Sequence, residues 1–141
     1  MILPDVNVLL YAFRQDSARH VDYHRWLEDT INADGAFGIA PQTLASLIRI
    51  STHSGIYVRP SQLSEAVAFS TALLRAPHCT VIQPGERHWE IFTELCDRSR
   101  ATGNLVQDAW FAALAIEAGC EWVTTDRDYA RFPGLRWREP F

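Results

Sequence analysis

Three aspartates that are far apart in the sequence each lie at one end of an apolar segment. Asp5 comes directly after a short apolar segment, and Asp126 comes directly after the apolar stretch 122–125. Asp108 lies in the first turn of the clearest helical pattern in the chain, residues 105–118. In open parallel sheets, ligands bind beyond the carboxyl ends of the strands. We therefore expect the three carboxylates to converge at one edge of a sheet.

Converging carboxylates repel one another unless a cation or a proton occupies the space between them. Because no histidine or cysteine accompanies them, the oxygen-only ligands favour Mg²⁺ or Mn²⁺ over zinc. Such an ion orients water, neutralises phosphate charge and stabilises a leaving oxygen in phosphodiester hydrolysis. Taken singly, Asp108 could serve only the helix dipole and Asp5 only a turn. It is their coincidence at one edge that indicates a metal site.

Alternating strands and helices are expected to position these side chains. Apolar segments bounded by turn signals predict strands at 2–5, 36–40, 79–82 and 122–125. A first helix is expected to begin at Val6. Apolar residues with a period of 3.6 predict five further helices, at 17–32, 41–53, 61–75, 86–98 and 105–118. This alternation predicts one α/β domain over residues 1–141, with a parallel sheet covered by helices on both faces.

Two details of these helices can be compared with a structure. Ser17 is the expected N-cap of the helix 17–32. In the helix 61–75, the row that we expect to face the core consists of Leu63, Val67, Ser70 and Leu74. A last extended piece is expected near residues 135–137.

The composition is typical of a folded domain: 48% of the 141 residues are hydrophobic and 21% are charged. No apolar run reaches the ~18 residues of a membrane span, and the start lacks the basic region of a signal peptide. The three cysteines are widely spaced, which argues against a structural zinc site. We therefore expect a cytoplasmic protein with no membrane partner.

The charged residues exclude two other classes of acidic-pocket protein. The net charge is −4, and all 13 basic residues are arginines. A receiver domain of two-component signalling and a haloacid-dehalogenase-type phosphatase both need a lysine, which this chain lacks. Since an acidic protein gains no global attraction to nucleic acid, binding of phosphodiesters would depend on local arginines.

Three stretches around the aspartates resemble the motifs of PIN-domain nucleases. Residues 5–7, Asp-Val-Asn, resemble the D-x-[SNT] start of that family. Residues 104–115 are similar to its D-A-x-x-A-A-x-A helix, and residues 123–129 to its T-x-D-x-D-F stretch. The resemblance spans the whole chain, whose size is similar to that of VapC-type toxins of bacterial toxin–antitoxin pairs.

This resemblance implies the ligands of the metal. Asp5, Asp108 and Asp126 match the acids that bind Mg²⁺ or Mn²⁺ in the family, and Asp128 is an additional candidate ligand. The supporting polar positions, which hydrogen-bond the acids or the waters of the metal, are matched by Asn7 and Thr124. The implied fold is a single PIN-like domain with a short, mostly parallel central sheet.

The same resemblance implies an activity and partners. The expected activity is that of a metal-dependent endoribonuclease that leaves 5′-phosphate and 3′-hydroxyl ends. The expected role is that of a growth-arresting toxin, which forms a homodimer and is blocked by a cognate VapB-type antitoxin. Arg14, Arg49 and Arg87 are the candidates for contacts with the RNA substrate, because arginine can bind phosphate bidentately.

One position departs from the family pattern. The family carries a glutamate in the helix after its second strand, in a T-x-x-E pattern, whereas this chain has Thr43 followed by Ser46 at that place. Because serine is neutral and a weak ligand for Mg²⁺, the site loses one charge. In the expected site Ser46 takes a supporting position beside the aspartates. The alternative is a catalytically weak or inactive PIN-like module that binds RNA or a protein, because serine stands in place of the family glutamate.

Overall fold

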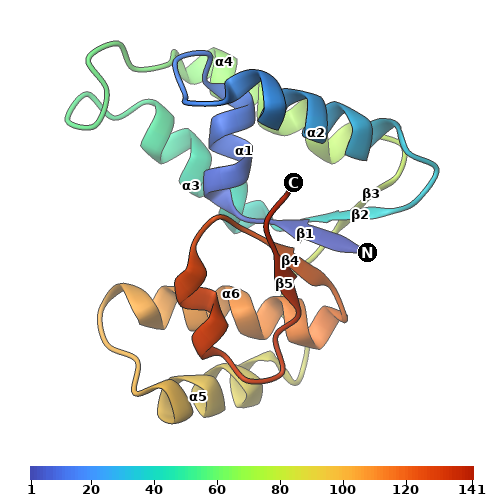
Figure 1. The fold of residues 1–141 in the computed structure, drawn as a ribbon, viewed down its shortest axis with the longest axis vertical. Helices are drawn as coiled ribbons and strands as arrows, with labels where there is room; N and C mark the ends of the chain where they lie inside the picture. The colour runs from blue at the N-terminus through green and yellow to red at the C-terminus, as the bar shows by residue number, and fades with distance from the viewer.

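The computed structural model describes residues 1–141 as short strands separated by helices (Figure 1). The strands are β1 (Ile2–Pro4), β2 (Phe37–Ile39), β3 (Cys79–Val81), β4 (Glu121–Val123) and β5 (Trp137–Arg138). The helices are α1 (Val6–Phe13), α2 (His20–Asn32), α3 (Pro41–Ser51), α4 (Leu63–Arg75), α5 (His88–Ser99) and α6 (Asn104–Ala118), and the 3₁₀ helix η1 covers Arg127–Arg131. The predicted α/β class and the predicted order of elements are confirmed.

Two small parallel sheets make up the central layer. β4 lies between β1 and β5, and β2 pairs with β3. The sheets adjoin along β1 and β2, where Gly38 permits a close approach. A Cβ on Gly38 would lie 3.2 Å from the carbonyl oxygen of Ile2 and 2.9 Å from the side chain of Ile82. The mostly parallel central sheet expected from the sequence is thus present, divided between β1 and β2.

Helices cover both faces of this layer, with α1 to α4 on one side and α5 and α6 on the other (Figure 1). Each face has its own cluster of buried side chains. Trp122 packs in the cluster with α6, whereas the next residue, Val123, packs in the cluster with α1 and α3. Successive residues of a strand point to opposite faces, so β4 contributes to both cores. No helix is both long and apolar enough to cross a membrane.

Two of the helical expectations are wrong. α2 begins at His20 and not at Ser17, because Arg19 adopts a left-handed conformation with φ 58° immediately before it. In α4 the expected inner row is mostly outward: Leu63 is 63% exposed, and Val67 and Leu74 are exposed as well. The buried positions are Ala66, Ser70 and Leu73. Ala66 and Leu73 belong to the buried cluster on this face of the sheet, and hydrophobic size alone does not reveal inward positions as small as Ala66 and Ser70.

Arg14, predicted to contact RNA, is instead a buried structural residue. Its side chain is 6% exposed and forms an ion pair with Asp16 at 2.6 Å. The guanidinium donates to the Ser61 hydroxyl and to the Arg59 carbonyl oxygen, each at 3.0 Å, and lies 3.6 Å from the ring centroid of Tyr57. These contacts join the end of α1 to the loop before α4. The guanidinium is therefore engaged within the fold, and the prediction for Arg14 is wrong.

We expect Arg14→Ala to lower the free energy of unfolding by about 2–3 kcal/mol, because a buried charged donor loses several partners and its aromatic contact. Urea unfolding of the purified protein measures this loss. Arg25→Ala, at an exposed arginine of α2, is the control and should change stability by about 0.5 kcal/mol or less. Equal stability of the two variants would contradict the structural role of Arg14.

Candidate active site

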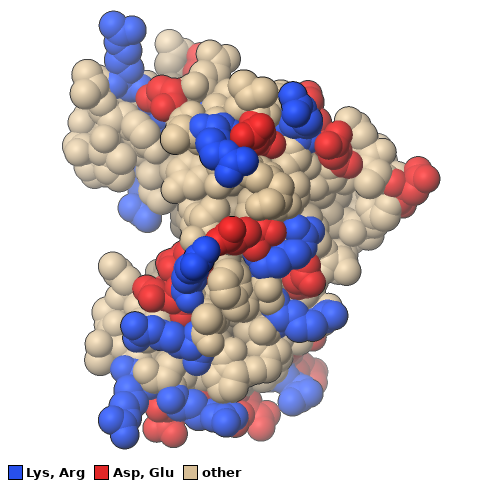
Figure 2. All heavy atoms as spheres, viewed as in Figure 1, with Lys and Arg blue, Asp and Glu red and all other residues tan.

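One cleft, with a volume of about 440 Å³, contains all three aspartates singled out in the sequence. Asp5 follows β1, Asp126 follows β4, and Asp108 lies in the second turn of α6. β1 and β4 are parallel neighbours with Pro4 opposite Val123, so their carboxyl ends lie side by side. The expected convergence at one edge of the sheet is therefore present. Figure 2 shows a recess between the two halves of the molecule with acidic side chains along its edge.

Asp5 is the most buried of the three, with 6% of its surface exposed. Its Oδ1 accepts the backbone N–H of Val6 at 2.6 Å, and this caps α1. Its Oδ2 accepts the hydroxyl of Thr124 at 2.7 Å. Burial, with a smaller contribution from the charges of Asp108 and Asp126, raises the pKa of Asp5 from 3.8 to about 6 in spite of these two hydrogen bonds. Burial thus dominates the two hydrogen bonds, which favour the charged form.

The hydroxyl of Thr124 joins the residues at this end of the cleft. Besides donating to Asp5, it accepts the backbone N–H of Asp126 at 3.0 Å. It also accepts the side-chain amide of Asn7 at 3.4 Å. Asn7 Oδ1 is buried and has no hydrogen-bond partner within the chain. The two polar residues expected to support the acids therefore contact them or each other, and one oxygen is left without a partner beside the cleft.

Asp126 and Asp128 belong to one turn. Asp126 Oδ1 accepts the backbone N–H of Asp128 at 2.9 Å and caps η1. Asp128 also lines the cleft, but its side chain is exposed and lies 3.7 Å from the guanidinium of Arg131. The structure therefore brings Asp128 to the cleft with a cationic neighbour, whereas Asp126 has no such neighbour.

Asp108 has a partner that the sequence did not indicate. The buried hydroxyl of Tyr129 donates to Asp108 Oδ1 at 3.5 Å. Burial raises the pKa of Asp108 from 3.8 to about 6, and the charges of Asp126 and Asp128 contribute. Burial also raises the pKa of Tyr129, which stays a neutral donor. The tyrosine occupies the aromatic position of the stretch 123–129, so its place was visible in the motif although its bond to Asp108 was not.

The remaining predicted residues are divided between the cleft and a distant surface. Ser46 and Arg49, both on α3, line the cleft, and Arg49 is its one basic residue. Arg87 does not line the cleft. Its backbone N–H donates to the carboxylate of Glu117 at 2.8 Å, near the end of α6 opposite Asp108. α5 begins at the other end of that helix, so Arg87 lies away from the cleft, and its contact with RNA stays a prediction.

Comparison with known proteins identifies the family. The PIN domain family matches residues 2–135. The chain is also 41% identical to VapC ribonuclease Mb2897 of Mycobacterium bovis, over 99% of this chain and 95% of that protein. The chain belongs to the VapC ribonucleases of the PIN-domain family. The resemblance inferred from the three sequence motifs is therefore confirmed.

Solved structures agree with the PIN fold. The VapBC2 structure from Rickettsia felis, bound to a DNA fragment from its promoter, has a TM-score of 0.70 at 21% identity, covering 99% of this chain and 98% of that chain. A toxin–antitoxin complex from Klebsiella pneumoniae has a TM-score of 0.65 at 20% identity, covering 100% and 98%. At these identities the likeness establishes the fold and nothing finer.

The residues in the cleft fit a hard divalent cation. Asp5, Asp108 and Asp126 supply carboxylate oxygens, and Asn7 Oδ1 is a buried oxygen that lacks a partner. No three acidic, histidine or cysteine side chains lie close enough to enclose an ion by themselves. Mg²⁺ is usually held by one or two carboxylates, with water and substrate phosphate completing its shell. The cleft suits that open form of binding.

We expect Asp108→Asn to stabilise the metal-free protein increasingly as the pH rises from 3.8 through about 6. Over this window the folded wild type keeps a proton on Asp108 that the unfolded chain releases, so its free energy of unfolding falls with pH. Urea unfolding in EDTA at several pH values measures the difference between wild type and variant. Asp97→Asn, at an exposed acid of α5, should show no such trend. A stability difference independent of pH would contradict the raised pKa of Asp108.

Proposed function

We propose that this chain is a Mg²⁺- or Mn²⁺-dependent endoribonuclease and the toxin of a VapBC-type pair. The observation that carries the proposal is the meeting of Asp5, Asp108 and Asp126, from three separate elements, in one cleft of a VapC-family chain. A site that holds carboxylates together at the cost of raised pKa values is typical of a functional site. A purely structural role would not require all three acids to line the same cleft.

The charge of the cleft supports a requirement for a cation. Four aspartates and one arginine line it. An RNA phosphate that enters would be repelled by these acids unless positive charge is added between them. When bound, a divalent ion supplies this charge, orients water and stabilises the leaving oxygen.

The chain's own residues would have distinct tasks around the substrate. The Thr124 hydroxyl fixes the orientation of Asp5, and the Tyr129 hydroxyl does the same for Asp108. Asn7 Oδ1, which lacks a partner, can accept a hydrogen bond from water in the cleft. Arg49 can bind a non-bridging phosphate oxygen. Together these groups would hold acids, water and phosphate in fixed relative positions, which is the main contribution of a protein to such a reaction.

The acidic cleft also suggests how a partner protein would block the activity. Relatives in solved structures are VapBC and toxin–antitoxin complexes. We propose a VapB-type antitoxin for this chain, with a cationic side chain that enters among the aspartates and forms charge-assisted hydrogen bonds. A homodimer remains part of the proposal, on the family resemblance alone.

We expect Asp108→Asn to reduce RNA cleavage by at least about 10²-fold, because it removes one carboxylate that would hold the cation. Asp108 is preferable to Asp5 for this test, because Asp5 also caps α1. The assay is cleavage of single-stranded RNA by purified, partner-free protein with Mn²⁺, and with EDTA as the metal-free reference. Asp97→Asn is the matched control and should cut like the wild type. Full activity of Asp108→Asn, or wild-type cleavage in EDTA, would refute the metal-dependent mechanism.

We expect Ser46→Glu to lower the Mn²⁺ concentration needed for half-maximal cleavage by about tenfold or more, because it adds the carboxylate that the family pattern carries at this place. A Mn²⁺ titration of the cleavage rate measures this shift. Ser46→Gln, of similar size and no charge, should leave the Mn²⁺ requirement unchanged. If the wild type cuts no RNA at any Mn²⁺ concentration and Ser46→Glu does, the alternative of an inactive binding module is correct for the natural chain.

A further inference from the structure

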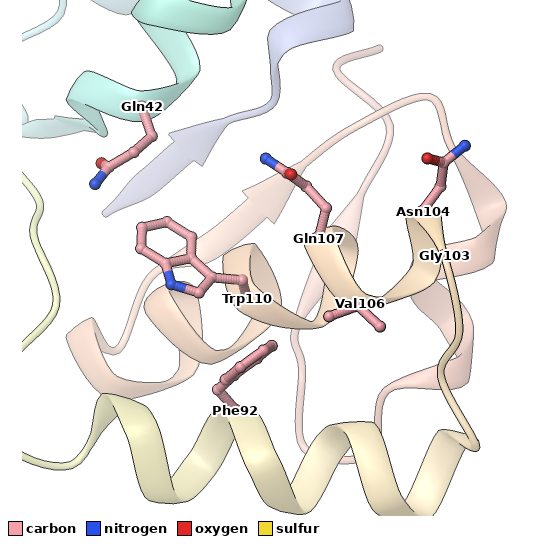
Figure 3. Close-up of a pocket in the computed structure, with 7 residues that line it drawn as sticks. All are labelled: Gln42, Phe92, Gly103, Asn104, Val106, Gln107 and Trp110. Atoms are coloured by element: carbon pink, nitrogen blue, oxygen red, sulfur yellow. The ribbon is translucent and has the colours of Figure 1, made fainter.

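A second recess adjoins the acidic cleft and shares Asn104 and Gln107 with it. It has a volume of about 380 Å³, and the side chains that define it are Gln42, Phe92, Asn104, Val106, Gln107 and Trp110. Figure 3 shows Gln42 of α3 above the indole of Trp110, Gln107 rising from α6, and Phe92 projecting from α5 toward α6. No charged residue lines this recess, whereas four aspartates line its neighbour.

The side chains of the recess combine two kinds of contact. Trp110, Phe92 and Val106 provide apolar and aromatic surface, on which a flat ring can stack. Gln42, Asn104 and Gln107 are exposed carboxamides, each with two donor hydrogens and one acceptor oxygen. Paired donors and acceptors of this kind match the edge of a nucleobase, and stacking on an aromatic side chain contributes about 1–3 kcal/mol per base.

The position of the recess connects it to the proposed chemistry. Gln107 and Asp108 are consecutive residues of α6, so a ligand that contacts Gln107 lies directly beside the acidic cleft. We propose that the recess binds one unpaired nucleobase of the RNA substrate, next to the phosphodiester held among the aspartates. Gln42 and Gln107 would read the edge of this base while Trp110 contacts its ring. The proposal rests on the proposed ribonuclease function and adds a determinant of its sequence specificity.

A base suits the recess better than a side chain of a protein partner. A charged side chain would find no opposite charge there, because the recess is uncharged. An apolar side chain would cover the carboxamides of Gln42 and Gln107 without satisfying their hydrogen bonds, which is costly. A nucleobase satisfies both the aromatic surface and the carboxamides.

Cleavage of a random-sequence RNA pool with Mn²⁺, followed by sequencing of the new ends, tests the proposal. The wild type should show a base preference at one position close to the cut. In the variant with both Gln42→Ala and Gln107→Ala, this preference should flatten and kcat/KM on the preferred sequence should fall about 10- to 100-fold. Preferences at other positions should persist. Gln62→Ala, at an exposed glutamine before α4 and outside both recesses, should behave like the wild type.

A binding measurement in EDTA separates this proposal from the proposed function. Free nucleosides, which carry no phosphate for the aspartates to repel, are titrated into ¹⁵N-labelled protein. The side-chain signals of Gln42, Gln107 and Trp110 should shift, and that of Gln62 should stay fixed. This experiment needs no variant, which matters because the Trp110 ring also packs against His88, at 4.8 Å between centroids, and Trp110→Ala could fail to fold.

Each outcome decides one of the two proposals. A wild type that cuts no RNA contradicts the ribonuclease function, while the shifts in EDTA still decide whether a base occupies the recess. Cleavage with unchanged base preference and kcat/KM in the double variant overturns the base site alone. The base site is also overturned if the double variant cuts like the wild type but no longer binds its purified partner protein, because the recess is then a contact with that partner.

Discussion

The parallel pairing of β1 with β4 is the constraint on which the cleft depends. The register places Pro4 opposite Val123, and the backbone N–H of Asp5 donates to the carbonyl oxygen of Val123 at 2.9 Å. Asp5 and Thr124 therefore emerge side by side, and their side chains are joined by a hydrogen bond of 2.7 Å. Backbone hydrogen bonding between parallel strands thus brings together Asp5 and Thr124, which are 119 residues apart in the sequence.

Electrostatics at this edge work against the fold rather than for it. Burial of Asp5 and Asp108 raises the pKa of both carboxyls to about 6, and neighbouring aspartates add repulsion. The acids nevertheless stay at these positions, because strand pairing and two apolar clusters stabilise the surrounding fold, and the hydroxyls of Thr124 and Tyr129 hydrogen-bond to Asp5 and Asp108. A proton or a cation can relieve the same repulsion, so the two compete for this cleft.

The sequence was sufficient for the parts of the structure that follow from local pattern. Strand ends carry Asp5 and Asp126, and the small-residue helix α6 carries Asp108, so their meeting followed from the rule for parallel sheets. The sequence was insufficient where tertiary contacts decide. Arg14 is polar and yet buried, because its partners come from residues 59 and 61, which pattern analysis cannot place beside α1. The same limit applies to α4, whose small residues Ala66 and Ser70 face inward, and to the bond between Tyr129 and Asp108.

The double engagement of Asp5 has an evolutionary consequence. One of its oxygens begins α1 and the other fixes Thr124, so a replacement at position 5 disturbs the start of a helix together with the cleft. Asp108 and Asp126 are not tied to the start of a long helix in this way. If copies of such a gene drift after losing their activity, folding alone continues to select for a helix-capping side chain at position 5. Decayed descendants should therefore retain aspartate, asparagine, serine or threonine at this position, and such a residue by itself is weak evidence that a family member still cuts.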